Sequence, residues 1–167
     1  FRAIDSKACA RLQQDNVPPW LARLYASRGL NTLQEAQLRL GELLHHGPMR
    51  NIDASARRIA RAIEEGETVV VADDYDADGT TATATAILGL RMLGARDPRF
   101  VVPDRFKHGY GLSVEVARLA AKHRLRLLIT ADNGIADFTG VEEARRLGMD
   151  VIVTDHHLAG ERLPETP

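Results

Sequence analysis

The sequence has 167 residues, of which 44% are hydrophobic and 27% are charged, and its formal net charge is −1. This composition is ordinary for a globular protein with one sizeable core. A near-neutral charge gives no support to nucleic-acid binding and does not exclude it, because a local basic patch can coexist with an acidic site. The single cysteine, Cys9, excludes a disulfide framework and a thiolate zinc site. No stretch approaches the ~18 apolar residues of a membrane span, so we expect a cytoplasmic protein without a membrane partner.

Residues 1–50 are predicted to form a separate segment of short helices. Two prolines open the stretch PPWLARLYASRGL, which suits a first helical turn, and Gly29 suits the end of that helix. A second helix is predicted over 32–44, where Thr32 and Glu35 have the spacing of a capping box.

A third helix is predicted over 54–66, near the start of the second segment. Asp53 is placed to cap this helix through its carboxylate. The apolar residues at helical spacing are Ala56, Ile59, Ala60 and Ile63. We expect this stripe to face a core.

From Thr68 onwards, apolar runs and helical patterns alternate, which predicts an α/β fold with a parallel, doubly wound sheet. Strands are expected over 68–73, 99–104, 126–132 and 150–155. Helices are expected between them, over 80–94, 113–123 and 139–148. Residues 80–86 largely alternate between threonine and alanine, a pattern that also fits a strand. We assign them to a helix because a right-handed crossover between parallel strands needs a connector of this length.

The expected strands over 68–73, 126–132 and 150–155 end in acidic residues, and ligands bind beyond the carboxyl ends of the strands in open parallel sheets. Seven side chains should therefore gather in one crevice: Asp74, Asp76, Asp78, Asp132, Asp155, His156 and His157. Carboxylates with imidazole and no thiolate suit Mg²⁺ or Mn²⁺. Because so many carboxylates exceed the needs of one ion, we expect a two-ion site of the kind used in phosphoryl chemistry.

Each part of this pattern also has a plainer interpretation. The loop DDYDADG, taken alone, also fits a solvated turn. The Asn133-Gly134 pair favours a simple turn. Adjacent histidines in a loop are often polar surface residues without a functional role. The same loop matches the start of an EF-hand calcium loop, but its twelfth position is Thr85 instead of a bidentate glutamate. A strand also precedes it where a helix is required, so we reject the EF-hand. The three patterns together are far more specific than any one of them.

The segments DYDADG, TADNGI and TDHH, in this order on alternating α/β elements, resemble the DHH phosphoesterases. The stretches VPDRFKHGYGLS and VIVTDHHLAGERLP resemble the bacterial branch that digests single-stranded DNA in the 5′→3′ direction during repair and recombination. The resemblance is clear over 52–167. It departs at Asp73, where the family often has glycine, and at Ala131, where it often has valine.

The resemblance implies that two Mn²⁺ or Mg²⁺ ions are bound by Asp74, Asp76, Asp78, Asp132 and His156. It also implies that His157 faces the scissile phosphate and that Asp155 orients the histidine pair. The family continues past this motif to a further aspartate ligand and a second domain. We therefore expect 51–167 to be an incomplete DHH catalytic core that hydrolyses DNA weakly or not at all by itself.

Substrate contacts are expected from the segment that follows the strand over 99–104. Arg105 is suited to grip a phosphate, His108 lies close to it, and Tyr110 offers a ring face for base stacking. The alternative is an ordinary glycine-bounded turn with Tyr110 packed inward. Single-stranded DNA is the expected partner, and repair or recombination proteins are candidate partners, while the oligomeric state is left open.

The expected function is metal-dependent hydrolysis of phosphodiester bonds, as the core of an exonuclease specific for single-stranded DNA. His157 is a candidate to neutralise charge on the phosphoryl oxygens or to protonate the leaving group. Two alternatives stay open. One is a DHH phosphoesterase for a small substrate, such as an oligoribonucleotide, a cyclic dinucleotide or pyrophosphate. The other is a metal-binding module without catalysis.

Overall fold

The computed structural model describes residues 3–37, 39, 41, 43, 45–123 and 125–166. It divides into two compact units, Phe1–Pro48 and Met49–Pro167, which are described one at a time. No helix within the described ranges is both long enough and apolar enough to cross a membrane.

The first unit is a small pair of helices, α1 (Ser6–Gln14) and α2 (Pro19–Ser27). Asp5 caps α1 by accepting hydrogen bonds from the backbone N–H groups of Lys7 and Ala8. Proline occupies the first turn of α2, as the sequence predicted. A small apolar core lies between the helices and consists of Ala8, Leu12, Val17, Ala22 and Ala26.

The prediction of an α-helix over 32–44 is wrong for the described residues, where Gln34–Ala36 form the short 3₁₀ helix η1. The N–H of Glu35 does donate to Oγ1 of Thr32, at 3.4 Å. Gln37, directly after η1, has an extended backbone conformation, and Leu43 is 73% exposed. A helix of this length needs an apolar face packed against a partner to be stable in water. Part of the predicted helix lies outside the described residues, at Leu38, Leu40, Glu42 and Leu44.

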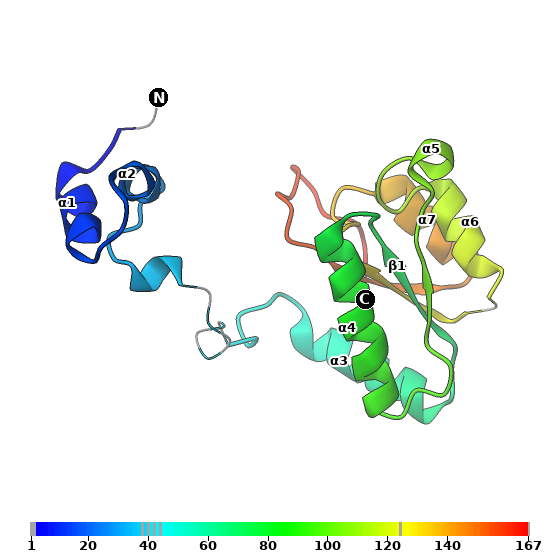
Figure 1. The fold of residues 1–167 in the computed structure, drawn as a ribbon. Coiled ribbons are helices and arrows are strands. Elements are labelled where there is room, and N and C mark those ends of the chain that lie inside the picture. The colour runs from blue at the N-terminus through cyan, green and yellow to red at the C-terminus, as the bar shows by residue number, and fades with distance from the viewer. Residues whose placement is uncertain are drawn as a thin grey trace. The chain divides into compact units, whose positions relative to one another are not determined.

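The second unit is built on a sheet of four parallel strands in the order β2-β1-β3-β4 (Figure 1). The strands are β1 (Val69–Asp73), β2 (Arg99–Val101), β3 (Leu127–Ala131) and β4 (Asp150–Thr154). The apolar runs of the sequence therefore predicted every strand of this sheet, although β2 is shorter than expected. The prediction of a parallel α/β fold is confirmed.

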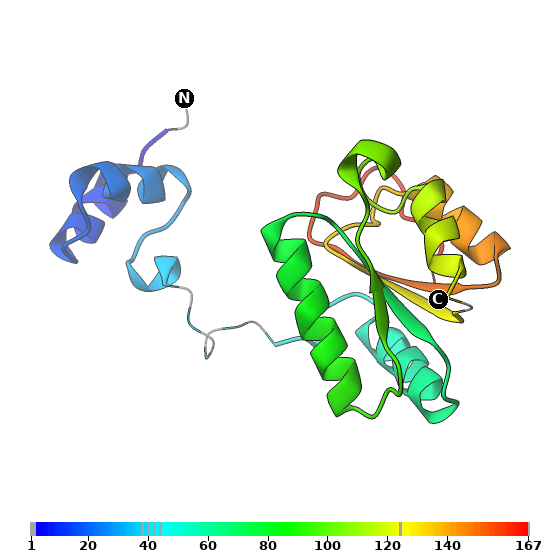
Figure 2. The same ribbon diagram turned by 45° about the vertical axis from the view of Figure 1, so that its right-hand side comes forward.

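Helices cover both faces of this sheet (Figure 2). The face formed by Val69, Val71 and the alternate residues of the neighbouring strands packs against α3 (Ile52–Glu64) and α4 (Ala77–Met92). The opposite face packs against α6 (Val114–Ala121) and α7 (Phe138–Arg146). Residues 80–86 lie within α4, so the assignment of that alternating stretch to a helix is correct. The sequence did not predict α5 (Arg105–His108), a single turn after β2.

The start of α3 differs from the prediction. Asn51, which adopts a left-handed conformation with φ 58°, occupies the N-cap position, and Asp53 lies in the first turn instead. Ala56 and Ala60 are exposed, so the expected apolar stripe is also partly wrong. The face of α3 that meets the sheet therefore differs from the predicted stripe, and it includes a buried charged residue.

Arg58 is the residue that accounts for this shift. Its guanidinium is only 7% exposed and lies 2.7 Å from the carboxylate of Glu67 and 2.6 Å from that of Asp150. A buried charge needs such partners, so α3 turns Arg58 towards them. Ile59 and Ile63 still pack against the core beside it, as expected.

The order of the strands determines where the loops meet. The connection through α4 leads from β1 to one edge of the sheet, whereas the connection through α7 leads from β3 to the other edge. The reversal occurs between β1 and β3, which is where doubly wound sheets bind ligands. Asp73, Ala131 and Thr154 are in register across the three strands β1, β3 and β4. The loops that follow these strands therefore start at the same level.

Candidate metal centre

Three loops at the carboxyl edge of the sheet carry the predicted ligands. Two overlapping groups place ligand atoms within 4.8 Å of one another: Asp76, Asp78 and Asp132, and Asp132, His156 and His157. Asp132 belongs to both groups. The structure therefore brings together side chains from the loops after β1, β3 and β4.

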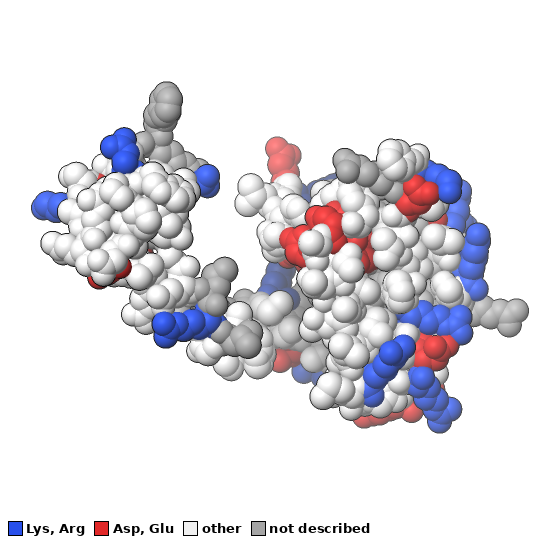
Figure 3. Space-filling view, viewed as in Figure 1, with Lys and Arg blue, Asp and Glu red and all other residues white. Residues whose placement is uncertain are grey.

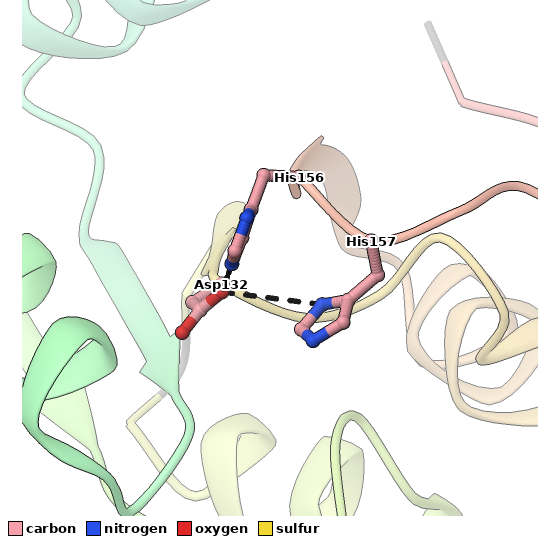
Figure 4. Close-up of side chains that lie close together, drawn as sticks. All are labelled: Asp132, His156 and His157. Carbon is pink, nitrogen blue, oxygen red and sulfur yellow. Dashed lines mark ion pairs between the residues drawn. The ribbon is translucent and has the colours of Figure 1, made fainter. Parts of the chain in front are cut away.

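The two imidazoles reach Asp132 from the loop after β4 (Figure 4). Nε2 of His156 lies 2.7 Å from Oδ1 of Asp132 and 3.9 Å from Oδ2 of Asp78. Nδ1 of His157 lies 3.9 Å from the same Oδ1 of Asp132. One carboxylate oxygen is thus shared between both histidines.

Asp132 owes its position to an unusual backbone conformation. It directly follows β3 with φ 63°, which is uncommon for a residue other than glycine and is held in place by its surroundings. Its N–H donates to the carbonyl of Thr154 on the neighbouring strand. The side chain is 7% exposed, and apart from the contact with His156 its buried Oδ1 has no hydrogen-bond partner. A buried carboxylate oxygen left in this state suits a bound cation.

The acidic loop after β1 supplies the remaining carboxylates, which gather at the N-terminal end of α4 (Figure 3). Asp76 is the N-cap of α4 and accepts a hydrogen bond from the N–H of Gly79. Asp78 lies exposed in the first turn of the helix. The positive end of the helix dipole favours negative charge at this place. Asp74 is buried, and its Oδ1 accepts from the N–H of Tyr75 at 2.8 Å.

Asp74 is not a member of either group of ligand atoms, although the sequence placed it among the ligands. Burial raises the pKa of its carboxyl above the ordinary value, and the negative charges of Asp76 and Asp132 raise it further. These charges act on Asp74 because the three acids lie near one another. Asp74 therefore contributes to the negative field of the site.

Asp73 is a further acid at this edge, and the sequence offered no role for it. It is 1% exposed, and neither carboxylate oxygen has a hydrogen-bond partner. Burial raises the pKa of this carboxyl to about 6. The edge thus holds an acid whose charge is not compensated by the described part of the chain.

Asp155 holds His157 in one orientation. Its Oδ1 accepts from the backbone N–H of His157 and lies 2.7 Å from Nδ1 of the ring, while its Oδ2 accepts from the N–H of Ile135. Burial alone would raise the pKa of Asp155, but these hydrogen bonds outweigh it and lower that pKa. The pKa of His157 is raised by Asp155 first, and then by the field of Asp132.

The predicted substrate residues have different surroundings. Tyr110 is 52% exposed, and its hydroxyl lies 3.3 Å from Nε2 of His157. Its ring meets that of Tyr75 edge to face, with 6.3 Å between centroids. His108 instead folds back onto its own turn, where Nδ1 accepts from the N–H of Asp104. Arg105 belongs to α5, and its side chain lies outside the described part of the chain.

Two residues near the site were not identified from the sequence. Tyr75 forms an aromatic pair with Tyr110. Asp137, whose pKa is raised by burial, accepts a hydrogen bond from the N–H of Leu112 at 2.7 Å. The only sequence signal at Asp137 is an acid before a predicted helix, which is also the signal of an ordinary N-cap.

The donor atoms match the chemistry of a hard or borderline divalent cation. Carboxylate oxygens and imidazole nitrogens converge, and thiolates are absent from the described groups. The acidic residues could therefore form a metal site of the kind that binds Mg²⁺ or Mn²⁺.

Comparison with known protein families decides the assignment. The family model described as "DHH family, N-terminal domain" matches residues 68–167, which is more than half of the chain. This chain belongs to the DHH family. The matched DHH region contains all four strands and both groups of potential ligands.

Relatives of this DHH chain carry the name single-stranded-DNA-specific exonuclease RecJ. The RecJ of Escherichia coli (strain K12) is 44% identical over 148 residues, which are 89% of this chain and 26% of the relative. The RecJ of Salmonella typhimurium (strain LT2) is 42% identical over 165 residues, which are 99% of this chain and 28% of the relative. The chain thus spans about a quarter of the length of these relatives.

Solved structures show the same fold. A crystal structure of RecJ from Thermus thermophilus in complex with Mn²⁺ has a TM-score of 0.64 and 28% identity, covering 99% of this chain and 23% of that one. A crystal structure of exonuclease RecJ bound to manganese has a TM-score of 0.67 and 35% identity, covering 74% of this chain and 32% of that one. The resemblance to DHH phosphoesterases and the expected fold class are confirmed.

Proposed function

We propose that this chain carries the metal-binding core of a phosphodiester hydrolase that removes nucleotides from the 5′ end of single-stranded DNA. The observation that carries the proposal is the pair of overlapping ligand groups that share Asp132. The substrate named for the RecJ relatives supports the choice of single-stranded DNA.

The proposed ligands of two Mn²⁺ or Mg²⁺ ions are Asp74, Asp76, Asp78, Asp132 and His156. Bound ions would supply Lewis-acid stabilisation of the phosphoryl charge and a more acidic water. Asp132 is the natural shared ligand, since its Oδ1 is buried and belongs to both groups. The manganese bound in the two similar RecJ structures supports Mn²⁺ as the first ion to test.

His157 is the proposed residue that acts on the substrate. Asp155 holds the imidazole ring of His157 at Nδ1 and raises the pKa of His157. A larger fraction of this imidazole is therefore protonated near neutral pH. A protonated ring can neutralise charge on the phosphoryl oxygens or donate a proton to the leaving oxygen. Asp155 is a positioning residue in this account.

The DNA strand is proposed to run along the segment that contains α5 and Tyr110. The half-exposed ring of Tyr110 offers a face for a base, and Tyr75 supports that ring from its edge. Arg105 is proposed to bind a backbone phosphate, and His108 borders the same segment.

The test is Mn²⁺-dependent release of mononucleotides from a single strand that carries a label at its 5′ phosphate, by a protein of the RecJ relatives' full length that carries this chain. Asp132→Asn should reduce the rate at least about 100-fold, since a shared ligand affects both ions. Asp97→Asn is the matched control, because Asp97 is an exposed acid before β2, at the other end of the sheet. Equal rates for wild type and Asp132→Asn would contradict the proposal.

The same assay separates the alternatives. Faster hydrolysis of dinucleotides than of a longer strand would favour a phosphoesterase for small substrates. Binding of Mn²⁺ without hydrolysis of either substrate would favour a metal-binding module. Release of label from the 3′ end first would contradict the proposed polarity.

A further inference from the structure

A short loop, residues 109–113, connects α5 to α6 and carries Tyr110 between two glycines. Gly109 and Gly111 have φ values of 76° and 69°, in the left-handed region that favours glycine. At the end of the loop Leu112 is buried in the main core. The loop is therefore short and anchored at one end, and its conformation determines where the Tyr110 ring lies.

The carboxylate of Asp137 holds this loop from the neighbouring segment. Asp137 occupies the N-cap position of α7, but its side chain forms no capping hydrogen bond with that helix. Instead its Oδ2 accepts from the N–H of Leu112 at 2.7 Å. A Cβ at position 111 would collide with the same carboxylate, so Gly111 allows this approach. The side chain gives up the usual role of an N-cap residue and binds a loop 25 residues away instead.

The loop also packs directly on the backbone of α7. A Cβ at Gly140 would collide with the carbonyl group of Leu112, so the loop backbone lies against the helix itself. Asp137 and Gly140 therefore contact Leu112 on its N–H and on its carbonyl. Two fixed contacts at one residue leave the loop little freedom to shift.

The consequence appears at His157. The Tyr110 hydroxyl lies 3.3 Å from Nε2 of this ring, while Asp155 lies 2.7 Å from Nδ1. Both ring nitrogens are thus engaged, although the side chain is 48% exposed. Without the Tyr110 contact, the described hydrogen bonds would hold the imidazole at Nδ1 alone.

We propose that Asp137 is a positioning residue, which holds the N–H of Leu112 and thereby sets the Tyr110 hydroxyl against Nε2 of His157. Its importance for catalysis rests on the proposed function, but the positioning itself can be measured on the metal-free chain. Asp137 contacts none of the proposed metal ligands in the described hydrogen bonds, so its replacement leaves the donor set intact.

The first test is nuclear magnetic resonance of the wild type and of Asp137→Asn and Asp137→Ala. The asparagine oxygen can still accept from the Leu112 N–H, whereas alanine cannot. Asp137→Ala should speed hydrogen exchange of the Leu112 amide at least about tenfold, the factor that corresponds to loss of about one hydrogen bond. It should also remove the nuclear Overhauser effect between the rings of Tyr110 and His157. Asp137→Asn should retain both signals.

Asp137→Ser guards against a misfolded alanine variant. Serine is a good N-cap residue, so α7 should remain stable, but its side chain is too short to replace the carboxylate at Leu112. It should therefore lose the same two signals as Asp137→Ala with unchanged thermal stability. Persistence of the contact between the Tyr110 and His157 rings in either variant would overturn the proposal.

The second test is a double-mutant cycle with Tyr110→Phe, which keeps the ring and removes the hydroxyl. If Asp137 acts through the Tyr110 hydroxyl, each single variant should lower kcat by a similar factor, and the double variant should lower it no further. Independent, multiplying losses would overturn the proposal. If a protein of the relatives' full length that carries this chain hydrolyses no DNA, the proposed function fails, and the resonance measurements still test the positioning.

Discussion

Two regions of the second unit differ in whether their buried charged side chains have partners of opposite charge. Among the helices, Glu143 lies 2.8 Å from Arg118 and 2.7 Å from Arg146, and these partners lower its pKa to about 2. Arg58 is likewise paired with two carboxylates. The buried charges of Glu143 and Arg58 are therefore compensated within the chain.

The carboxyl edge of the sheet shows the opposite pattern. Asp73, Asp74 and Asp132 are buried there, and none of them forms an ion pair with a lysine or arginine in the described part of the chain. Uncompensated buried carboxylates reduce stability, so a fold that needed only stability would not keep them. The described carboxylates at this edge therefore suit a bound divalent cation.

The largest effect is expected where a paired charge is broken. Arg58→Ala leaves the carboxylates of Glu67 and Asp150 without their buried partner and should lower the free energy of unfolding by about 3 kcal/mol. Arg61→Ala is the matched control, because Arg61 is 57% exposed and lies 3.9 Å from Asp150. Urea unfolding measures both variants. Equal losses would remove the distinction between buried and exposed pairs.

Removal of an unpaired buried charge should stabilise the protein. Asp73→Asn should raise the free energy of unfolding of the metal-free protein by about 1–3 kcal/mol above pH 6, since a pKa unit corresponds to about 1.4 kcal/mol. The folded pKa of Asp73, about 6, exceeds the ordinary value of 3.8, so the folded state holds the proton longer than the unfolded state. Stability of the wild type should therefore fall as pH rises from 4 to 6, and the variant should lack this contribution.

Urea unfolding in the presence of a chelator tests this pH dependence. The informative quantity is the difference in unfolding free energy between wild type and Asp73→Asn at each pH. A difference that stays constant across this range would show that Asp73 is not the uncompensated acid described above.

The two histidines should separate ion binding from catalysis. His156→Asn should weaken Mn²⁺ binding roughly tenfold and change Ca²⁺ binding little, because imidazole favours transition metals over Ca²⁺. His157→Asn should leave Mn²⁺ affinity nearly unchanged and abolish hydrolysis, since Asp155 and Tyr110 already engage its two ring nitrogens. Calorimetry with each ion measures the affinities. Weaker Mn²⁺ binding in His157→Asn, with unchanged binding in His156→Asn, would contradict the proposed roles of the two histidines.

The smallest effect is expected at the proposed DNA-binding segment. Arg105→Ala should weaken binding of single-stranded DNA several-fold and reduce the slope of log affinity against log salt by about 0.7, as for one lost phosphate contact. Arg91→Ala is the control, because Arg91 lies at the far end of α4. Fluorescence anisotropy at several salt concentrations measures both. An unchanged slope in Arg105→Ala would show that Arg105 does not contact a phosphate.

The sequence predicted those parts of the fold that depend on local pattern. The apolar runs before Asp73, Asp132 and Asp155 identified three buried strands, and the crossover rule assigned residues 80–86 to a helix. The gathering of acids at one edge followed from the parallel order of the strands. These inferences need only the side-chain pattern and the topology of the sheet.

The failures concern residues whose environment is set by distant contacts. Asp53 had the right chemistry for a helix cap, but Asn51 occupies that position because the chain enters α3 through a left-handed turn. Ala56 was assigned to a buried stripe, yet the ion pair of Arg58 decides which face meets the sheet. The hydrogen bond from Leu112 to Asp137 was likewise invisible, since it joins two loops that are far apart in the sequence.

The central claim is that the unpaired carboxylates form an ion-binding site organised around Asp132. The most direct test is calorimetric titration of the metal-free chain with Mn²⁺, for the wild type and Asp132→Asn. Changes to residues that only support a ligand cost about 10–100-fold in metal affinity, so loss of the shared ligand should cost at least about 100-fold. We expect two ions to bind the wild type and that loss in the variant. Equal affinity for both proteins would contradict the account.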